Sequence, residues 1–396
     1  MSKIKVLLVH NRYQLPGGED LGFDSEVRML RENGHEVIEY VRKNNDIKNY
    51  SFPQKILFPK EMTWSQRTYE EISKILIDKK PDIAHFHNTF PLISPSAYYA
   101  CQKFNIPVVQ LLNNYRLICP GGFLFRDDKV CEDCISKSLM ESVKNRCYKN
   151  SYLLSSSLAM MIKFHRIKNT WFSHVNKYIS LSEFSKNKYV EAGFKANQIF
   201  VKSNFIEKDP LKRNKYDNHV LFFGRLSREK GPHIFIKAAE NLINTKIKFR
   251  IIGNGPMDKE LNNYVLKKKI TNVEFVNHIS NSDIFNQIKS AKFVVIPMMW
   301  YEFLPRVLIE TLACGVPIIT SDIGVMANIV RNQINGLHFK VGDHKDLSKK
   351  IIKLFNDDLL VDKISKNNRD LYLSEYTKEK NYQKLINIYN EVLDEI

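Results

Sequence analysis

Two glutamates flank the start of an expected helix in the stretch WYEFLPRVLIETLACGVP. Pro305 fits the first helical position, where the missing N–H of proline costs nothing, so Glu310 falls about a turn and a half inside the helix and Glu302 in the loop before it. The amides of Phe303 and Leu304 lie between the two carboxylates, at a helix N-terminus that favours anions. A nucleotide sugar would satisfy this arrangement, because its hydroxyls can donate to the carboxylates while its diphosphate accepts from the amides. The spacing alone also allows one capping glutamate and one surface glutamate.

A second group of residues is suited to a diphosphate. In VLFFGRLSREKG, Gly224 ends an expected strand, and Arg225 and Lys230 stand between it and the next helix. Glycine lets a ligand approach the backbone, and two cations at a helix start suit a diphosphate. The same segment also fits a plain strand, turn and helix with an exposed arginine and lysine.

The next expected strand ends in a similar glycine turn, FRIIGNGP, where Asn254 follows Gly253. The third glycine and the following acid of a dinucleotide-binding motif are missing, which disfavours a nicotinamide-dependent enzyme. We expect Gly253 and Asn254 to lie at the same nucleotide-binding edge as Gly224.

The N-terminal half also carries polar residues at strand ends. Gly17 and Gly18 follow the first expected strand and permit close approach of a ligand to the backbone. HFHNTFPLISPS places His87 and Asn88 at the end of another strand, where we expect contact with substrate. His85 and His87 share one strand face, but no acidic third ligand stands nearby in the sequence, which disfavours a metal site there.

Four of the six cysteines fall in one polar insert, residues 119–147. Cys131 and Cys134 form a C-x2-C pair, with Cys119 before it and Cys147 after it. Four thiolates in a reducing compartment are the ingredients of a closed, structural zinc site. A full zinc signature has two such pairs and this insert has one, so four unlinked thiols are the alternative.

Short runs rich in valine and isoleucine alternate with segments of helical period along the chain, which predicts βα units and parallel sheets. Five expected strands precede Leu181, and five more lie between Val220 and Asp322. The polar stretch 197–218 separates the two sets and is expected to link two domains. Ligands bind at the carboxyl ends of parallel strands, so we expect a site in the cleft between two facing Rossmann-like domains.

We therefore predict an α/β protein of two domains, each large enough to bury its own core. Residues 1–196 form an N-terminal domain that contains the cysteine-rich insert, and residues 197–375 form a C-terminal domain that carries the residues suited to a nucleotide sugar. A last helix in residues 376–396 could complete either domain, including by packing back on the N-terminal one.

The chain carries a formal charge of +17, and part of this charge is concentrated. Between Ile135 and Val190, ten Lys or Arg residues stand against two Glu residues and are interleaved with aromatic residues. Such a segment suits an anionic membrane surface, although a solvated helix face on a lysine-rich protein is the alternative. No recognition motif for nucleic acid accompanies the charge, so nucleic acid is not an expected partner.

No apolar segment approaches the roughly 20 residues that a bilayer span needs, and the first apolar run is too short for a signal peptide. We expect a cytoplasmic protein, peripheral at the inner face of the membrane, with reduced cysteines.

Seven motifs of the chain, in their order and approximate spacing, resemble those of the retaining GT-B glycosyltransferases, the large nucleotide-sugar family with an E-x7-E signature. The motifs are YQLPGGED, HNTFPLISPS, NYRLICPGG, FGRLSREKG, IIGNGP, YEFLPRVLIETLACGVPII and NGLHF. The resemblance runs nearly end to end and is closest to the branch that builds bacterial surface polysaccharides, such as capsule and O-antigen, on a lipid carrier. It implies transfer of a sugar from a UDP- or GDP-sugar to a glycan or lipid-linked glycan without a catalytic metal ion. Consistently, the sequence contains no D-x-D triplet.

The resemblance also implies roles for matching residues. Arg225 and Lys230 would stabilise the diphosphate leaving group, while Glu302 positions the donor sugar and Glu310 binds the ribose. Gly17 and Gly18 would form the loop that faces the diphosphate.

One position departs from the pattern of this branch. Where the branch usually has histidine before NYR, this chain has Asn113. That histidine is thought to contact the donor sugar, and an amide can still donate a hydrogen bond but cannot take a proton. A second interpretation is therefore a catalytically degenerate homologue that binds a glycan or a partner protein.

Overall fold

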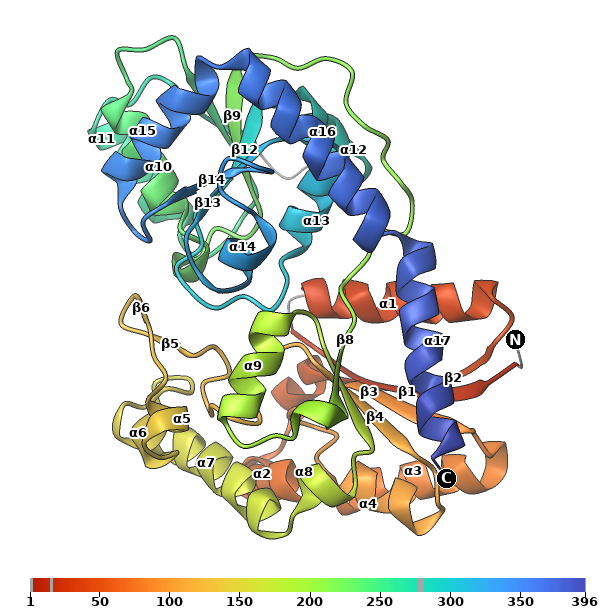
Figure 1. Cartoon of the computed structure of the whole chain (residues 1–396). Coiled ribbons are helices and arrows are strands. Elements are labelled where there is room, and N and C mark those ends of the chain that lie inside the picture. Colours follow the sequence, from red (N-terminus) through yellow and green to blue (C-terminus); the bar gives the residue numbers. More distant parts are fainter. Residues whose placement is uncertain (1–2, 15–16, 277–280, 396) are drawn as a thin grey trace. The chain divides into compact units, whose positions relative to one another are not determined.

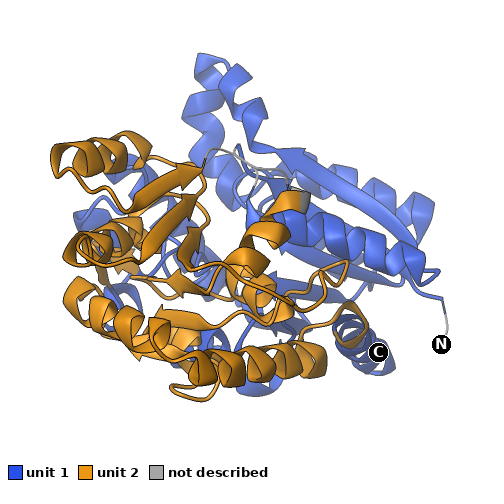
Figure 2. Ribbon diagram, turned by 90° about the horizontal axis from the view of Figure 1, so that it is seen from above, with its two compact units in different colours: residues 1–124, 131–203, 381–396 blue, residues 125–130, 204–380 orange. Residues whose placement is uncertain are grey.

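The computed structural model describes residues 3–14, 17–276 and 281–395. The chain divides into two compact units, which Figure 2 shows in different colours. Unit 1 comprises residues 1–124, 131–203 and 381–396, and unit 2 comprises residues 125–130 and 204–380. Each unit is built on its own parallel sheet, so the predicted α/β architecture with two parallel-sheet domains is confirmed.

The sheet of unit 1 has six described strands in the order β2-β1-β3-β4-β7-β8, all parallel. Its central strands are buried along nearly their whole length, as expected for a parallel sheet covered on both faces. The strands are β1 (Lys5–Arg12), β2 (Glu36–Lys43), β3 (Ile83–Asn88), β4 (Val108–Leu112), β7 (Lys177–Ser180) and β8 (Ile199–Val201).

Helices cover both faces of this sheet. On β3, His85 contacts the last helix while the neighbouring Phe86 packs on Tyr98, 4.8 Å away between ring centroids. The helices of unit 1 are α1 (Gly18–Glu32), α2 (Phe52–Thr63), α3 (Gln66–Lys79), α4 (Ser96–Lys103), α5 (Asp133–Ser136), α6 (Met140–Lys144), α7 (Tyr152–Ile167), α8 (Thr170–Ser173), α9 (Glu183–Glu191) and most of α17 (Lys378–Asp394). In Figure 1, α1 and α17 lie on one side of the sheet and α3 and α4 on the other. None of the helices in the described part of the chain combines the length and apolarity that a bilayer span requires.

Unit 2 repeats the architecture with the described strand order β11-β10-β9-β12-β13-β14. Aliphatic and aromatic side chains from one face of this sheet form a buried cluster with the helices that pack on that face. The strands are β9 (His219–Phe223), β10 (Lys248–Ile252), β11 (Val273–Val276), β12 (Phe293–Ile296), β13 (Ile318–Ser321) and β14 (Leu337–Phe339). The helices are α10 (Pro232–Asn241), α11 (Asp258–Lys267), α12 (Asn281–Ser290), α13 (Arg306–Ala313), α14 (Gly324–Ile329), α15 (His344–Phe355) and α16 (Asp358–Glu375). A separate hairpin pairs β5 (Phe125–Arg126) with β6 (Lys129–Val130).

Three details differ from the expectations. Strand β8 lies inside the stretch 197–218 that was expected to be a link, and β14 was not expected as a strand. Both have only three residues, which is too short for a clear alternation pattern. Helix α13 begins at Arg306, so Pro305 is its N-cap, with φ of −69°, and not its first helical residue.

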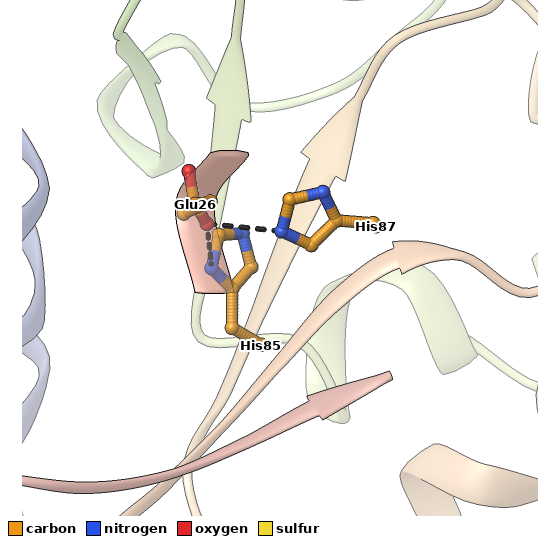
Figure 3. A group of neighbouring side chains, drawn as sticks. All are labelled: Glu26, His85 and His87. Carbon is orange, nitrogen blue, oxygen red and sulfur yellow. Dashed lines mark hydrogen bonds and ion pairs between the residues drawn. The ribbon is translucent and has the colours of Figure 1, made fainter. Parts of the chain in front are cut away.

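A buried carboxylate, Glu26 on α1, lies at the centre of unit 1. Figure 3 shows the imidazoles of His85 and His87 pointing toward it, with His85 Nδ1 3.0 Å and His87 Nε2 2.9 Å from Oε1. Its other oxygen, Oε2, lies 2.7 Å from Lys202 Nζ. The acidic neighbour that the sequence did not place beside His85 and His87 therefore comes from α1.

The same three side chains have the composition and compactness of a metal site, since one ligand atom from each lies within 4.8 Å of the others. Lys202 already supplies the positive charge that Glu26 needs. Burial opposes the ionised form of Glu26, but Lys202 and the two histidines outweigh it, and the pKa of this carboxyl lies well below its ordinary value. We therefore interpret the group as a buried ion pair braced by two imidazoles.

Replacing the cation tests this interpretation. Lys202→Met should destabilise unit 1 by about 3–5 kcal/mol at pH 7, because an ionised carboxylate is left buried without its partner. In the wild type the lowered pKa keeps Glu26 ionised, so the ion pair is lost only as the pH falls through that pKa. In the variant, burial raises the pKa of Glu26, so protonation at pH 5 should shrink the difference between the two proteins. Urea unfolding at pH 5 and pH 7 measures the difference in stability between the wild type and the variant.

The matched control is Lys195→Met, which removes an exposed lysine of the same unit. It should change the unfolding midpoint little at either pH. An equal loss for Lys202→Met at pH 5 and pH 7 would show that its methylene chain, rather than its charge, stabilises the unit.

Candidate active site

The carboxyl edge of the unit 2 sheet is lined by glycine turns. Gly253 has φ of +141°, and a Cβ added there would lie 1.9 Å from the carbonyl oxygen of Gly224. Gly231 has φ of +72°, and a Cβ added there would lie 1.9 Å from the carbonyl oxygen of Pro297. Any larger residue would push these loops apart. The turns after β9, β10 and β12 therefore pack closely, and this places the side chains they carry side by side.

Lys230 and Glu302 meet at this edge. The Lys230 ammonium forms an ion pair with Glu302 Oε2, and it lies 5.5 Å from the ring centroid of Trp300. The backbone N–H of Met299 donates to the carbonyl of Glu229 at 2.9 Å, which fastens the loop after β12 to the turn before α10. Both charged side chains keep some exposure, 23% for Lys230 and 17% for Glu302, so each can reach a ligand. Two residues singled out separately in the sequence thus form one pair.

Glu310 lies on α13, one turn after Arg306. Its Oε1 is 3.7 Å from Arg306 Nε, and its side chain is 16% exposed. Burial raises the pKa of the Glu310 carboxyl, while Arg306 acts in the opposite direction. An acceptor of hydrogen bonds with limited exposure is suited to neutral hydroxyl donors.

The other residues expected at this edge differ in exposure. Arg225 is exposed, and no hydrogen bond or ion pair of its guanidinium occurs within the described ranges. Asn254 accepts a bond from the N–H of Leu226 through its carbonyl, at 2.9 Å. The side chains of Phe303 and Leu304 are buried, at 2% and 3% exposure, so only their backbones are available to a ligand.

The predicted substrate residues of unit 1 line one small pocket. It includes His87, Asn88 and Asn113, together with Gln110 and Arg116 among others. The side chains of the first two are already engaged. His87 contacts Glu26, while Asn88 donates to the carbonyl of Asn11 at 2.8 Å and accepts from the N–H of Phe90 at 3.0 Å. Asn113 Oδ1 accepts from Asn114 at 3.1 Å. The structure therefore brings these three residues together, with Asn113 the least constrained.

Gly17 is the N-cap of α1 and Gly18 its first residue. The next residue, Glu19, was missed in the sequence: its carboxylate accepts from Tyr13 Oη at 2.7 Å and from the side chain of Asn114. Burial raises the pKa of Glu19 to about 7, although both hydrogen bonds lower it. Glu19, an acid that titrates near neutrality, thus joins the glycine turn to the Asn113–Asn114 loop. The sequence GGED was the signal that could have identified Glu19.

The four predicted zinc ligands come close together in unit 1. The side chains of Cys119 and Cys134 hydrogen bond to each other, and Cys131 and Cys147 are near enough for their charges to act on Cys134. The bond with Cys134 lowers the pKa of Cys119 to about 6 against the effect of burial, helped by the backbone N–H groups of Leu124 and Gly122. All six cysteines, each within the described ranges, are free thiols.

Comparison with known proteins gives a family match for part of the chain. The model for "Glycosyl transferases group 1" matches residues 203–371, most of unit 2. An uncharacterized glycosyltransferase of Methanocaldococcus jannaschii is 24% identical over 395 residues, covering 99% of both chains. A capsular polysaccharide biosynthesis glycosyltransferase of Staphylococcus aureus, CapM, is 28% identical over 238 residues, 55% of this chain and 62% of its own. An Escherichia coli enzyme, UDP-Gal:alpha-D-GlcNAc-diphosphoundecaprenol alpha-1,3-galactosyltransferase, is 27% identical over 192 residues, 46% of this chain and 47% of its own.

Among solved structures, HepE of Anabaena in complex with UDP and glucose superposes with a TM-score of 0.69 at 16% identity, covering 98% of this chain and 99% of HepE. This similarity extends the assignment of the fold to both units. Residues 203–371 thus match the group 1 glycosyltransferases, and the fold of the chain is the GT-B fold of its solved structural neighbours.

Proposed function

We propose that this chain is a retaining, metal-independent glycosyltransferase. It transfers a sugar from a nucleoside diphosphate sugar, UDP- or GDP-linked, to a glycan or lipid-linked glycan in the synthesis of a bacterial surface polysaccharide. The observation that carries the proposal is the meeting of Lys230 and Glu302 at the carboxyl edge of the unit 2 sheet, which the closely packed glycine turns bring about.

Each side chain at this edge has a role that fits its chemistry. Breaking the sugar–phosphate bond leaves negative charge on the diphosphate, and the cations Lys230 and Arg225 stabilise that charge more in the transition state than in the ground state. Glu302 accepts from the hydroxyls of the donor sugar. Glu310, which is largely buried, accepts from the ribose hydroxyls. Because Lys230 pairs with Glu302, the cation for the diphosphate lies next to the carboxylate for the donor sugar.

The proposed reaction needs no dedicated general base. The bond from the anomeric carbon to the phosphate oxygen breaks, and the bond to the acceptor oxygen forms on the same face of the sugar. The proton of the acceptor hydroxyl passes to the leaving phosphate, so the products are the nucleoside diphosphate and the new glycoside. Asn113 can orient the donor sugar by hydrogen bonding but takes no proton.

The names of similar proteins support the substrate classes. HepE was solved with UDP and glucose, which favours a UDP-sugar as donor. CapM acts in capsular polysaccharide biosynthesis, and the Escherichia coli relative uses a diphosphoundecaprenol acceptor, which favours a lipid-linked acceptor here.

A lipid-linked acceptor calls for contact with a membrane, and unit 1 has a suitable surface. Helices α2 and α7 pack on each other, and both carry large apolar side chains that are more than 40% exposed. On α7 they follow one face at helical spacing, with Lys163, Arg166 and Lys168 nearby. We name this the α2/α7 surface; its exposed apolar residues are Phe52, Ile56, Leu57, Tyr152, Leu153, Met160, Phe164 and Ile167. Apolar residues with neighbouring cations suit the inner, anionic leaflet of a membrane, where the protein would be peripheral.

Asn113 is the observation that favours a second candidate, a catalytically degenerate homologue that binds glycan or a partner protein. It would bind a nucleotide sugar weakly or not at all and turn over no donor. The experiments below distinguish the active glycosyltransferase from the degenerate homologue.

Lys230→Ala should abolish the rise in melting temperature that UDP or GDP produces, because the diphosphate loses its partly exposed cation. It should also lower kcat/KM by about 10²–10³, the usual effect of removing one transition-state donor. Lys246→Ala is the matched control: this exposed lysine precedes β10, at the opposite end of that strand from Gly253. No shift of the wild type with any nucleotide or nucleotide sugar would favour the degenerate homologue.

The stereochemistry and metal requirement can be measured in one assay. Proton NMR of the product should show the anomeric configuration of the donor retained. Added Mg²⁺ or Mn²⁺ should change the rate by less than about two-fold, because protein cations stabilise the leaving group. An inverted product, or strict dependence on a divalent ion, would contradict this part of the proposal.

Met160→Glu combined with Ile167→Glu should reduce binding to vesicles containing phosphatidylglycerol by about ten-fold or more, since two exposed apolar contacts of α7 are replaced by repelled charges. Ile77→Glu, at an exposed residue of α3 in the same unit, is the control for charge alone. Flotation with vesicles measures the binding, and equal loss in both proteins would rule out a specific α2/α7 surface.

A further inference from the structure

The insert of residues 119–147 has almost no apolar core. All residues of the insert are described, and Leu124 is its one branched aliphatic side chain that is buried. Its other buried residues without a polar side chain are Cys119, Pro120, Gly122 and Cys134. Its helices α5 and α6 have four and five residues. Helices of this length are unstable on their own. Segments with so little core usually need a cross-link or a metal ion to hold one conformation.

The four cysteines of the insert are arranged to provide such a cross-link or to bind a metal ion. Cys119 and Cys134 are in hydrogen-bond contact. Gly121 lies between Cys119 and Cys147, since a Cβ added there would be 3.6 Å from Cys119 Sγ and 3.6 Å from Cys147 Cβ. Cys131 enters from the same turn as Cys134, with its sulfur 3.5 Å from Asp133 Oδ2. Three separate stretches of chain thus bring the four cysteines into one neighbourhood, with Cys119 and Cys134 in direct contact.

The backbone around Cys119 is shaped for a sulfur that carries negative charge. The N–H groups of Gly122 and Leu124 both donate to its side chain. These bonds require a tight turn, in which Gly122 and Leu124 have φ of +82° and +47°. Amide bonds to a sulfur favour the thiolate that a metal ion needs.

Two cations lie near the group. Arg116 acts electrostatically on Cys119 and Arg166 on Cys134. A zinc ion with four thiolates would have a net charge of −2, so nearby guanidinium groups would offset it. The other two cysteines, Cys101 and Cys314, lie outside the insert and are buried.

We propose that Cys119, Cys131, Cys134 and Cys147 bind one structural zinc ion. Four sulfur ligands fill a tetrahedral shell, so the site is closed and takes no part in the transfer chemistry. Its role is to hold the insert against the loop that carries Asn113 and Arg116. That loop is tied to the cysteine turn by the N–H of Tyr115 donating to Gly122 at 3.0 Å and the N–H of Cys119 donating to Tyr115 at 2.7 Å.

The test begins with the full-length wild type, purified without added metal and analysed by elemental mass spectrometry. One zinc per chain is expected. Titration with a mercurial reagent should release this zinc to a chromogenic chelator as four thiols react. Replacement by Co²⁺ should give the absorption bands of tetrahedral cobalt thiolate.

Variants then assign the ligands. Cys131→Ser should lower the zinc content well below one and lower the melting temperature. Cys314→Ser, which changes a cysteine outside the insert, should keep one zinc per chain. Because the Co²⁺ spectrum is recorded on the wild type, the proposal stays testable even if a ligand variant fails to fold. Less than about a tenth of a zinc per chain, with four titratable thiols, two disulfides or an iron–sulfur absorption in the wild type, would overturn it.

Discussion

Unit 1 depends on one buried carboxylate. Glu26 comes from a helix near the start of the chain, its two imidazole partners come from β3, and its cation is Lys202 at the end of β8. The same cation contacts Asn381 of α17 at 3.2 Å, and Asn381 in turn donates to the carbonyl of Ser203. The chain leaves unit 1 after Ser203 and returns at Asn381. A single ion pair therefore fastens two of the unit's connections, the one after Ser203 and the one before Asn381, to its own core. Strand β3 and helices α1 and α17 share this electrostatic centre.

Unit 2 is organised differently, by backbone approach rather than by buried charge. Close packing of Gly224 with Gly253, and of Gly231 with Pro297, leaves no room for side chains between the loops. Lys230 and Glu302 can then remain partly exposed and paired beside the apolar core cluster of the unit. An edge built from backbone and two opposite charges can exchange its internal ion pair for contacts with a polar ligand. Such an exchange is less costly than opening a buried network such as that of Glu26.

Much of this could be predicted from local patterns. The ten expected strands and the α/β class follow from the alternation of apolar runs, and these strands occur in the two sheets. Lys230 and Glu302 were each chosen for their position at a helix start, but their pairing across 72 residues has no local signal. Glu26 was not predicted at all, since an acid inside an amphipathic helix looks like a surface residue until its partners 61 and 176 residues away are known. Strands β8 and β14 were missed because three residues are too few to show a period.

The return of the chain into unit 1 has a consequence for biosynthesis. The partners Asn381 and Ser203 are 178 residues apart in sequence, and Tyr389 bonds to His85 of β3 at 2.7 Å. During translation, the segment that forms unit 2 emerges before these last contacts can be made. Unit 2 can therefore fold on the ribosome, whereas unit 1 must wait with part of its sheet uncovered until α17 is available. The face of β3 that carries His85 therefore stays without its α17 contact during this interval.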